Sequence, residues 1–152
     1  MLSLDYITGG KTGFTELARR TLVTTGSKNN MNIVVVTLND PNDWSDHKTL
    51  YENVFQNYQS IELLNKDNFK VDTKDYYKKD NLYIKNNYNM TLNKEEVKKV
   101  NLNIKLIKLK DYVNDMQVGY VEVVLNDQIF HKEPIYVSKK EIAKEKKLVA
   151  KV

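Results

Sequence analysis

The sequence contains no cysteine, so disulfide bonds and thiol chemistry are excluded and the redox compartment is left open. With two histidines in 152 residues, a histidine-rich metal site is not expected, and neither is any other cofactor. No segment approaches the roughly 20 consecutive apolar residues that a membrane-spanning helix needs. The first five residues have neither a basic nor an apolar region, so no signal peptide is expected.

The net positive charge is concentrated in residues 139–152. Residues 139–152 carry six lysines and two glutamates, which account for the whole net charge of +4 and leave a neutral body. Arginine, which bidentate phosphate and base recognition favours, supplies only 2 of the 24 basic residues. We therefore expect no nucleic-acid binding. The basic tail is either a frayed, solvated end or a helical segment with weak contact to an anionic membrane surface.

Apolar residues make up 41% of the chain, enough for a real core in one average domain or two small ones. Residues 5–38 contain three extended segments, and the last is the continuous apolar run from Ile33 to Val36, typical of a strand covered on both faces. Apolar residues then recur every three or four positions from His47 to Tyr58, which predicts an amphipathic helix over 43–59.

The pattern changes near residue 60. From Ile61 to Ser138 the chain has short alternating runs without a helical period, which indicates a small β-sandwich. A bulge is expected at Leu106-Ile107, and a two-residue hairpin turn at Asn126-Asp127. We therefore predict an α+β fold, with a first domain over 1–59, an all-β sandwich domain over 60–138 and the tail over 139–152.

The segment from Gly9 to Thr15 contains the main candidate binding residues of the chain. Gly10-Lys11-Thr12 invites comparison with a phosphate-binding loop, but that pattern needs a glycine where this chain has Asp5. It also needs a helix beginning at the lysine, whereas the β-branched residues that follow favour extended backbone.

A strand explains the same residues better. On a strand, Lys11 and Gly13 point to one face, and Thr12 points to the other or along the edge. The missing side chain at Gly13 lets another backbone approach closely. An ammonium and a hydroxyl beside that gap suit the carboxylate of an extended peptide laid along the strand. The alternative is a glycine-rich β-turn with an exposed lysine, and the residues alone leave both interpretations open.

The order of segments resembles the carboxy-terminal portion of the low-molecular-mass penicillin-binding proteins, which are serine D-alanyl-D-alanine carboxypeptidases. The resemblance covers nearly the whole chain and is carried by Lys11-Thr12-Gly13-Phe14-Thr15, Met31-Asn32-Ile33-Val34-Val35-Val36-Thr37-Leu38 and Val118-Gly119-Tyr120-Val121-Glu122-Val123-Val124-Leu125. The run Asn39-Asp40-Pro41-Asn42-Asp43-Trp44 is particularly similar to the sporulation-type members of clostridia and bacilli. Arg19 departs from the pattern, because many members have glycine there. The implied fold is the end of a transpeptidase-like antiparallel sheet followed by a small β-domain.

The resemblance also implies roles for the motif residues. Lys11 would bind the terminal carboxylate of the substrate, directly or through water, and Thr12 would hydrogen-bond it beside Gly13. The backbone N–H of Phe14 would supply one half of the oxyanion hole. In the family, a serine attacks the bond between two D-alanines of a peptidoglycan stem peptide, and β-lactams acylate the same serine.

The family's other two motifs, Ser-x-x-Lys and Ser-x-Asn, come before the Lys-Thr-Gly strand, and only ten residues precede Lys11 here. Ser45 and Lys48 have the first spacing, but they lie after the motif on the predicted helix and are interpreted as a capped helix start. The nucleophile is therefore expected to be absent, and the chain alone to be inactive. Pairing with an amino-terminal fragment, or a homodimer, would cover the strand at Ile33 to Val36.

Two functions remain open. The chain is either the carboxy-terminal part of a D-alanyl-D-alanine carboxypeptidase of the cell envelope, or a non-catalytic scaffold module that binds cell wall or a protein. In the first case, stem peptides and β-lactams are partners of the complete enzyme only. The genomic sequence immediately upstream would separate the two.

Overall fold

The computed structural model describes residues 4–71, 73, 76, 77 and 81–138, so the tail predicted over 139–152 lies outside the described residues. The chain divides into two compact units, residues 1–63 with 89–100 and residues 64–88 with 101–152. The predicted boundary near residues 59–61 falls close to the first of these divisions, but the domain limits remain a prediction.

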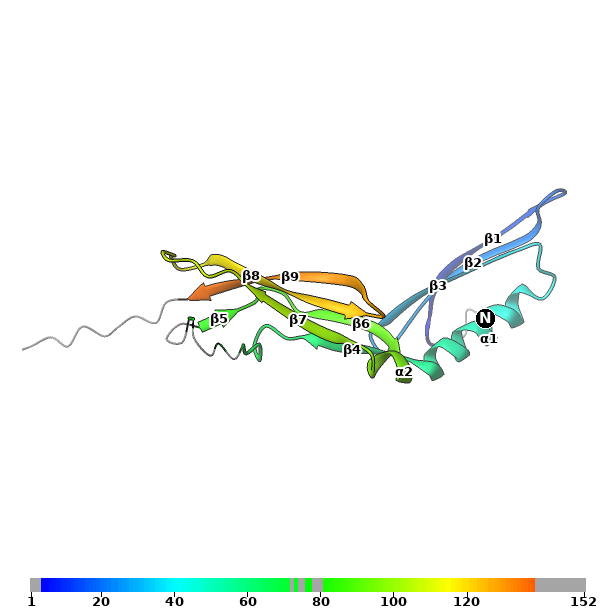
Figure 1. The fold of residues 1–152 in the computed structure, drawn as a ribbon. Coiled ribbons are helices and arrows are strands. Elements are labelled where there is room, and N and C mark those ends of the chain that lie inside the picture. Colours follow the sequence, from blue (N-terminus) through cyan, green and yellow to red (C-terminus); the bar gives the residue numbers. More distant parts are fainter. Residues whose placement is uncertain (1–3, 72, 74–75, 78–80, 139–152) are drawn as a thin grey trace, which may run out of the picture. The chain divides into compact units, whose positions relative to one another are not determined.

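The elements confirm the predicted α+β class (Figure 1). Residues 7–57, the first part of the chain, contain three strands and the long helix that the sequence predicted. Residues 58–138, the second part, are rich in strands. In chain order the elements are β1 (Ile7–Thr15), β2 (Arg19–Lys28), β3 (Met31–Leu38), α1 (Asp43–Asn57), β4 (Tyr58–Leu64), β5 (Asn81–Tyr83), β6 (Tyr88–Asn93), α2 (Lys94–Val97), β7 (Asn101–Leu106), β8 (Met116–Leu125) and β9 (Gln128–Ser138).

Strands β1, β2 and β3 form an antiparallel sheet in that order, so β1 and β3 are its edges. Residues paired across neighbouring strands share a face of the sheet. One face carries the buried residues Leu22, Thr24 and Val35, and α1 packs against it. The opposite face carries Lys11, which is paired with Val23.

The β3 strand is covered on one face only, which corrects the expectation drawn from its apolar run. Met31 and Val35 are buried on the α1 side, whereas Val34, Val36 and Leu38 on the other side are 64%, 58% and 72% exposed. The physical reason is that α1 is the helix that packs on this sheet within the described residues, and one helix reaches one face. The opposite face is therefore an uncovered apolar surface.

Helix α1 begins and ends close to the predicted limits, but its buried stripe differs from the predicted one. The buried residues are Asp43, His47 and Tyr51, spaced by four, while Leu50 is exposed. Asn42 occupies the N-cap position without a side-chain cap hydrogen bond. The burial of His47 and Tyr51 agrees with the predicted stripe, whereas Asp43 takes a core position that the apolar pattern did not assign to it.

After α1 the chain forms a two-stranded sheet, β4-β6, which belongs almost entirely to the first compact unit. The second unit contains a four-stranded antiparallel sheet in the order β5-β9-β8-β7. The hairpin turn is confirmed: Leu125 pairs with Gln128, and Asn126 and Asp127 have φ values of 49° and 63°. Such left-handed backbone at both turn residues is what a two-residue hairpin requires.

Two details of the second part differ from the expectation. The bulge predicted at Leu106-Ile107 is wrong, because β7 ends at Leu106 and pairs with β8 without a register shift. The irregularities instead lie in the β8-β9 pairing. The short helix α2 was not predicted. It has too few residues to show a helical period, although Asn93 and Glu96 form a capping box that the sequence pattern could have revealed.

Candidate functional site

Residues 11–14 lie within β1, the edge strand of the three-stranded sheet, and all four are exposed. β1 continues to Thr15, and a short turn at 16–18 leads into β2. The strand prediction for this segment is therefore confirmed, and the phosphate-loop comparison is excluded because no helix begins at Lys11.

Lys11 lies on the sheet face opposite α1. Its Nζ donates a hydrogen bond to the carbonyl oxygen of Thr12 at 2.6 Å, so the side chain folds back along its own strand. Because Val23 pairs with both Lys11 and Val36, these three residues share one face. Lys11 thus lies on the same sheet face as the exposed apolar residues of β3, with β2 between the two strands.

Gly10 and Gly13 let β1 and β2 approach closely. A Cβ built on Gly13 would lie 2.5 Å from Oγ1 of Thr21, and one on Gly10 would lie 2.8 Å from the carbonyl oxygen of Val23. The sequence led us to expect that the missing side chain at Gly13 leaves room for another backbone. In the structure, the side chain of Thr21 occupies this space on the face of the sheet. What remains open is the outer edge of β1.

Thr12 and Phe14 lie on the same side of the sheet as α1, since they pair with Leu22 and Arg20. A groove of about 500 Å³ runs between this end of β1 and the start of α1 and is lined by both residues together with Asp43 and Trp44. A smaller hollow of about 210 Å³ lies next to it, also against Thr12 and Trp44. The motif strand therefore has accessible space on the α1 side as well as along its edge.

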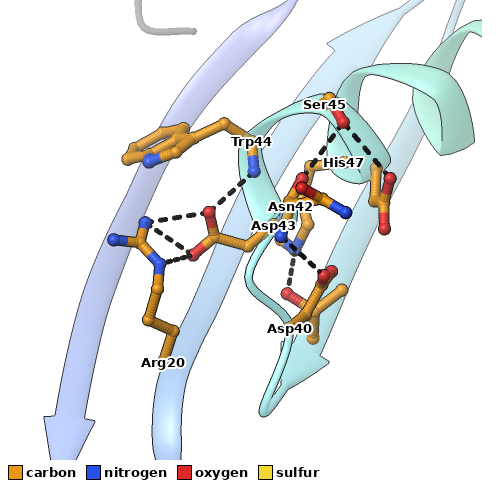
Figure 2. A network of polar contacts seen from close by, with 9 residues as sticks. Arg20, Asp40, Asn42, Asp43, Trp44, Ser45 and His47 are labelled. Atoms are coloured by element: carbon orange, nitrogen blue, oxygen red, sulfur yellow. Dashed lines mark hydrogen bonds and ion pairs between the residues drawn. The ribbon is translucent and has the colours of Figure 1, made fainter.

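Arg20 and Asp43, which both line the larger groove, form a bidentate ion pair. Figure 2 shows the contacts between the two side chains. Arg20 Nε lies 3.1 Å from Asp43 Oδ2, and Nη2 lies 2.9 Å from both carboxylate oxygens. Asp43 is 1% exposed and also accepts a hydrogen bond from the backbone N–H of Trp44 at 2.8 Å. The hydrogen bonds from Arg20 hold the pKa of the Asp43 carboxyl below its usual value, against the opposing effect of burial.

Sequence reasoning missed this pair. One signal was present, because Arg20 is one of only two arginines in a chain whose other basic residues are lysines. Arginine is favoured where a planar, bidentate contact to a carboxylate is made. The partner could not be found from the pattern, since Asp43 lies 23 positions further along the chain.

Ser45 and Lys48 on α1, which have the Ser-x-x-Lys spacing, are not arranged so that the lysine could activate the serine as a nucleophile. Ser45 Oγ donates to the carbonyl oxygen of Asn42 at 3.2 Å, and Lys48 Nζ lies 3.7 Å from Glu52. Ser27-Lys28-Asn29, a segment whose composition is typical of a turn, has the Ser-x-Asn spacing. It ends β2 four residues beyond Val23, the partner of Lys11, which places it roughly 13 Å along the strand from the motif.

Neither a metal site nor a membrane span is found in the described part of the chain. No group of three or more histidine, aspartate or glutamate side chains is placed to hold a metal ion there. The helices of the described ranges are too short or too polar to cross a membrane.

Comparison with known proteins identifies the family. Residues 58–150 match the family model of the penicillin-binding protein 5 C-terminal domain, which is more than half of the chain. The chain belongs to this family. Residues 2–42 match the D-alanyl-D-alanine carboxypeptidase family model, and this matched segment includes Lys11 to Phe14.

Three solved structures share the fold. The D-alanyl-D-alanine carboxypeptidase DacD from Francisella tularensis is 18% identical with a TM-score of 0.61, over 91% of this chain and 38% of that one. Penicillin binding protein 5 from Haemophilus influenzae is 20% identical with a TM-score of 0.61, over 89% and 42%. A peptidoglycan synthesis regulatory factor (PBP3) from Streptococcus pneumoniae is 14% identical with a TM-score of 0.63, over 92% and 44%. The chain thus spans about two fifths of the length of these proteins, and no curated protein sequence matches it.

Proposed function

We propose that the chain is the carboxy-terminal part of a D-alanyl-D-alanine carboxypeptidase of the cell envelope that acts on peptidoglycan stem peptides. Its contribution is the strand that binds the terminal carboxylate of the substrate. The observation that carries the proposal is the position of residues 11–14 on an exposed strand edge, within the segment that matches the carboxypeptidase family. Assignment to the sporulation-type members rests on the sequence resemblance and is part of the proposal.

The substrate peptide would extend along the outer edge of β1 and add its backbone to the sheet. Lys11 stands on one face of β1 and Thr12 on the other, so a carboxylate placed at the edge between them can be approached from both sides. Lys11 would contribute a charged hydrogen bond and Thr12 a hydroxyl donor. The N–H of Phe14 would stabilise the oxyanion that forms when the serine attacks.

Binding by this chain alone would be weak. A charged hydrogen bond contributes about 1.5–3 kcal/mol, less than the ~4 kcal/mol that corresponds to a millimolar dissociation constant. The chain also carries no Ser-x-x-Lys before Lys11. It therefore needs a second polypeptide segment for both affinity and chemistry.

We expect that segment to cover the face of the sheet that carries Lys11. Val34, Val36 and Leu38 form an exposed apolar surface on this face, and a helix bearing the serine nucleophile would bury them while facing the ammonium. The β3 edge is open for a further strand in the three-stranded sheet. A second copy of this chain could cover the apolar surface but would bring no nucleophile.

Labelling with a fluorescent penicillin tests the proposal. The purified chain should not be labelled. Co-expression with the region encoded immediately upstream should give a complex that is labelled and that releases D-alanine from a stem peptide. Lys11→Ala should weaken both activities, and Lys108→Ala, an exposed lysine outside the three-stranded sheet, should leave them unchanged.

Covalent labelling of the chain alone would contradict the proposal. An upstream region without a Ser-x-x-Lys would favour the non-catalytic scaffold function instead. A purely homodimeric chain that never associates with the upstream region would overturn the proposed role of the apolar surface.

A further inference from the structure

We propose that the Arg20–Asp43 ion pair is a positioning device for the end of the motif strand, and that it sets the orientation of the Phe14 N–H. The inference rests on the proposed function and adds two positioning residues to it. Neither residue belongs to the Lys-Thr-Gly motif, and neither is placed to touch the substrate through that motif.

The first step is the pairing of the two strands. Arg20 is directly opposite Phe14 in the β1-β2 ladder, and Thr21 is opposite Gly13. Because neighbouring strands are joined by backbone hydrogen bonds, any displacement of Arg20 moves the backbone of Phe14 with it. Fixing Arg20 therefore fixes the residue whose N–H would face the oxyanion.

The second step is that this end of the hairpin has little other support. Phe14 is 66% exposed and Leu17, in the turn, is 98% exposed. In the described part of the chain, the Arg20–Asp43 contacts are the side-chain polar contacts that join residues 12–21 to α1. An edge strand that ends in an exposed turn frays unless something holds it.

The third step is that Asp43 is itself held in place by its surroundings. It is nearly fully buried, it begins α1, and it accepts the N–H of Trp44. One turn further along, His47 is fully buried, with Nδ1 2.7 Å from Thr24 Oγ1 and Nε2 3.0 Å from Thr37 Oγ1. Hydrogen bonds thus connect helix α1 to β2 and β3. The ion pair connects the same helix to Arg20, which pairs with Phe14 at the end of β1.

The geometry of the pair suits this task. Two nitrogens of a planar guanidinium on one carboxylate fix direction as well as distance, which a lysine ammonium at the same position cannot do. Small displacements of groups that orient a reaction can cost about 100-fold in rate. Arg20→Lys, which keeps the charge but loses the bidentate contact, is therefore the informative substitution.

The matched control lies next to it. Arg19 is exposed and lies on the opposite face of β2, where it is paired with Thr15. Arg19→Lys makes the same chemical change one residue away without touching Asp43. Asp43→Asn removes the charge from the other partner and completes the set.

The first experiment uses the chain itself and needs no activity. In amide NMR spectra, Arg20→Lys and Asp43→Asn should shift the Phe14 amide resonance. Both variants should also show faster hydrogen exchange of the backbone amides at positions 20 and 21. Arg19→Lys should leave the Phe14 resonance in place. An unmoved Phe14 amide in both test variants, with the fold retained by circular dichroism, overturns the inference.

The second experiment uses the complex with the upstream region and measures the rate of penicillin acylation. Arg20→Lys and Asp43→Asn should lower the acylation rate constant by about 10- to 100-fold while changing the affinity for the terminal carboxylate little. A merely structural role would reduce the labelled fraction but leave the rate constant of the folded molecules unchanged, which overturns the inference.

The second experiment distinguishes failure of this inference from failure of the proposed function. Failure of the unmodified complex to acylate contradicts the proposed function and would leave no oxyanion for Phe14 to serve. A normal acylation rate in folded Arg20→Lys, in a complex that does acylate, contradicts the positioning role alone.

Discussion

Arg19 faces Thr15 across the turn end of the β1-β2 hairpin, with its backbone in the left-handed region at φ 56°. Left-handed backbone costs an ordinary residue roughly 1–2 kcal/mol, and glycine avoids this cost because it has no Cβ. A glycine at this position would therefore be favoured on conformational grounds. β2 nevertheless begins at Arg19 in this chain.

Arg19→Gly should therefore stabilise the protein. The gain is limited to about 1 kcal/mol, because glycine also loses more conformational entropy on folding. Arg19→Lys, which keeps the Cβ, should change the free energy of unfolding little. Urea unfolding curves of the three proteins measure the difference, and a lower midpoint for Arg19→Gly would contradict the conformational explanation.

His47 should make stability depend on pH near neutrality. Burial lowers its pKa, although Asp43, Asp40 and Asp46 oppose this. As the pH falls below the usual histidine value of about 6.5, the unfolded chain binds a proton that the folded chain does not. The free energy of unfolding should therefore fall between about pH 6.5 and pH 5.

Thermal unfolding at pH 7.5, 6.5 and 5.5 measures this dependence. His47→Gln should flatten the change in midpoint over that interval and lower the midpoint at pH 7.5, because the hydrogen bonds to Thr24 and Thr37 are altered. An unchanged pH dependence in His47→Gln would show that another group is responsible.

Gly13→Ala should destabilise the motif strand. The added Cβ would lie 2.5 Å from Thr21 Oγ1, which is closer than van der Waals contact allows. A steric conflict of this kind costs typically 1–3 kcal/mol. The double variant Gly13→Ala with Thr21→Ala removes the opposing oxygen and should recover most of the loss, as measured by urea unfolding.

Gly10→Ala is the contrasting change. Its Cβ would meet the backbone carbonyl oxygen of Val23 at 2.8 Å, and no side-chain substitution can relieve that contact. If Thr21→Ala rescued Gly10→Ala as well as Gly13→Ala, the close approach at Thr21 would not be the cause.

Glu122 on β8 should add acid sensitivity to the four-stranded sheet. Its carboxylate is buried, with Lys132 Nζ at 2.8 Å and Lys105 Nζ at 3.0 Å. The neighbouring ammonium groups, Lys132 first and Lys105 second, lower its pKa, so the stabilisation is present above the usual glutamate value and is lost as the pH falls below about 4.

Glu122→Gln should remove this contribution. Unfolding measured between pH 5 and pH 3 should be less pH-dependent in the variant, and the variant should be less stable at pH 7. Glu52→Gln, which alters an exposed pair with Lys48 at 3.7 Å, should leave the stability at pH 7 close to that of the wild type. A wild-type acid profile in Glu122→Gln would contradict the assignment.

Much of the fold follows from local patterns in the chain. The three strands, the helix over Asp43–Asn57 and the turn at Asn126-Asp127 were predicted because periodicity and turn chemistry are properties of neighbouring residues. The helix α2 and the end of β7 were not, because a four-residue helix has no period and a strand end depends on where its partner stops.

For the site, the sequence by itself determined the chemical groups: an ammonium, a hydroxyl and a glycine in a row on extended backbone. Tertiary structure alone decided that Arg20 meets Asp43, that Asp43 occupies a core position of α1, and that one face of β3 stays uncovered. Each of these depends on pairing between segments distant along the chain. Register and helix placement set such pairing through the packing of the whole unit, and no local run of residues encodes it.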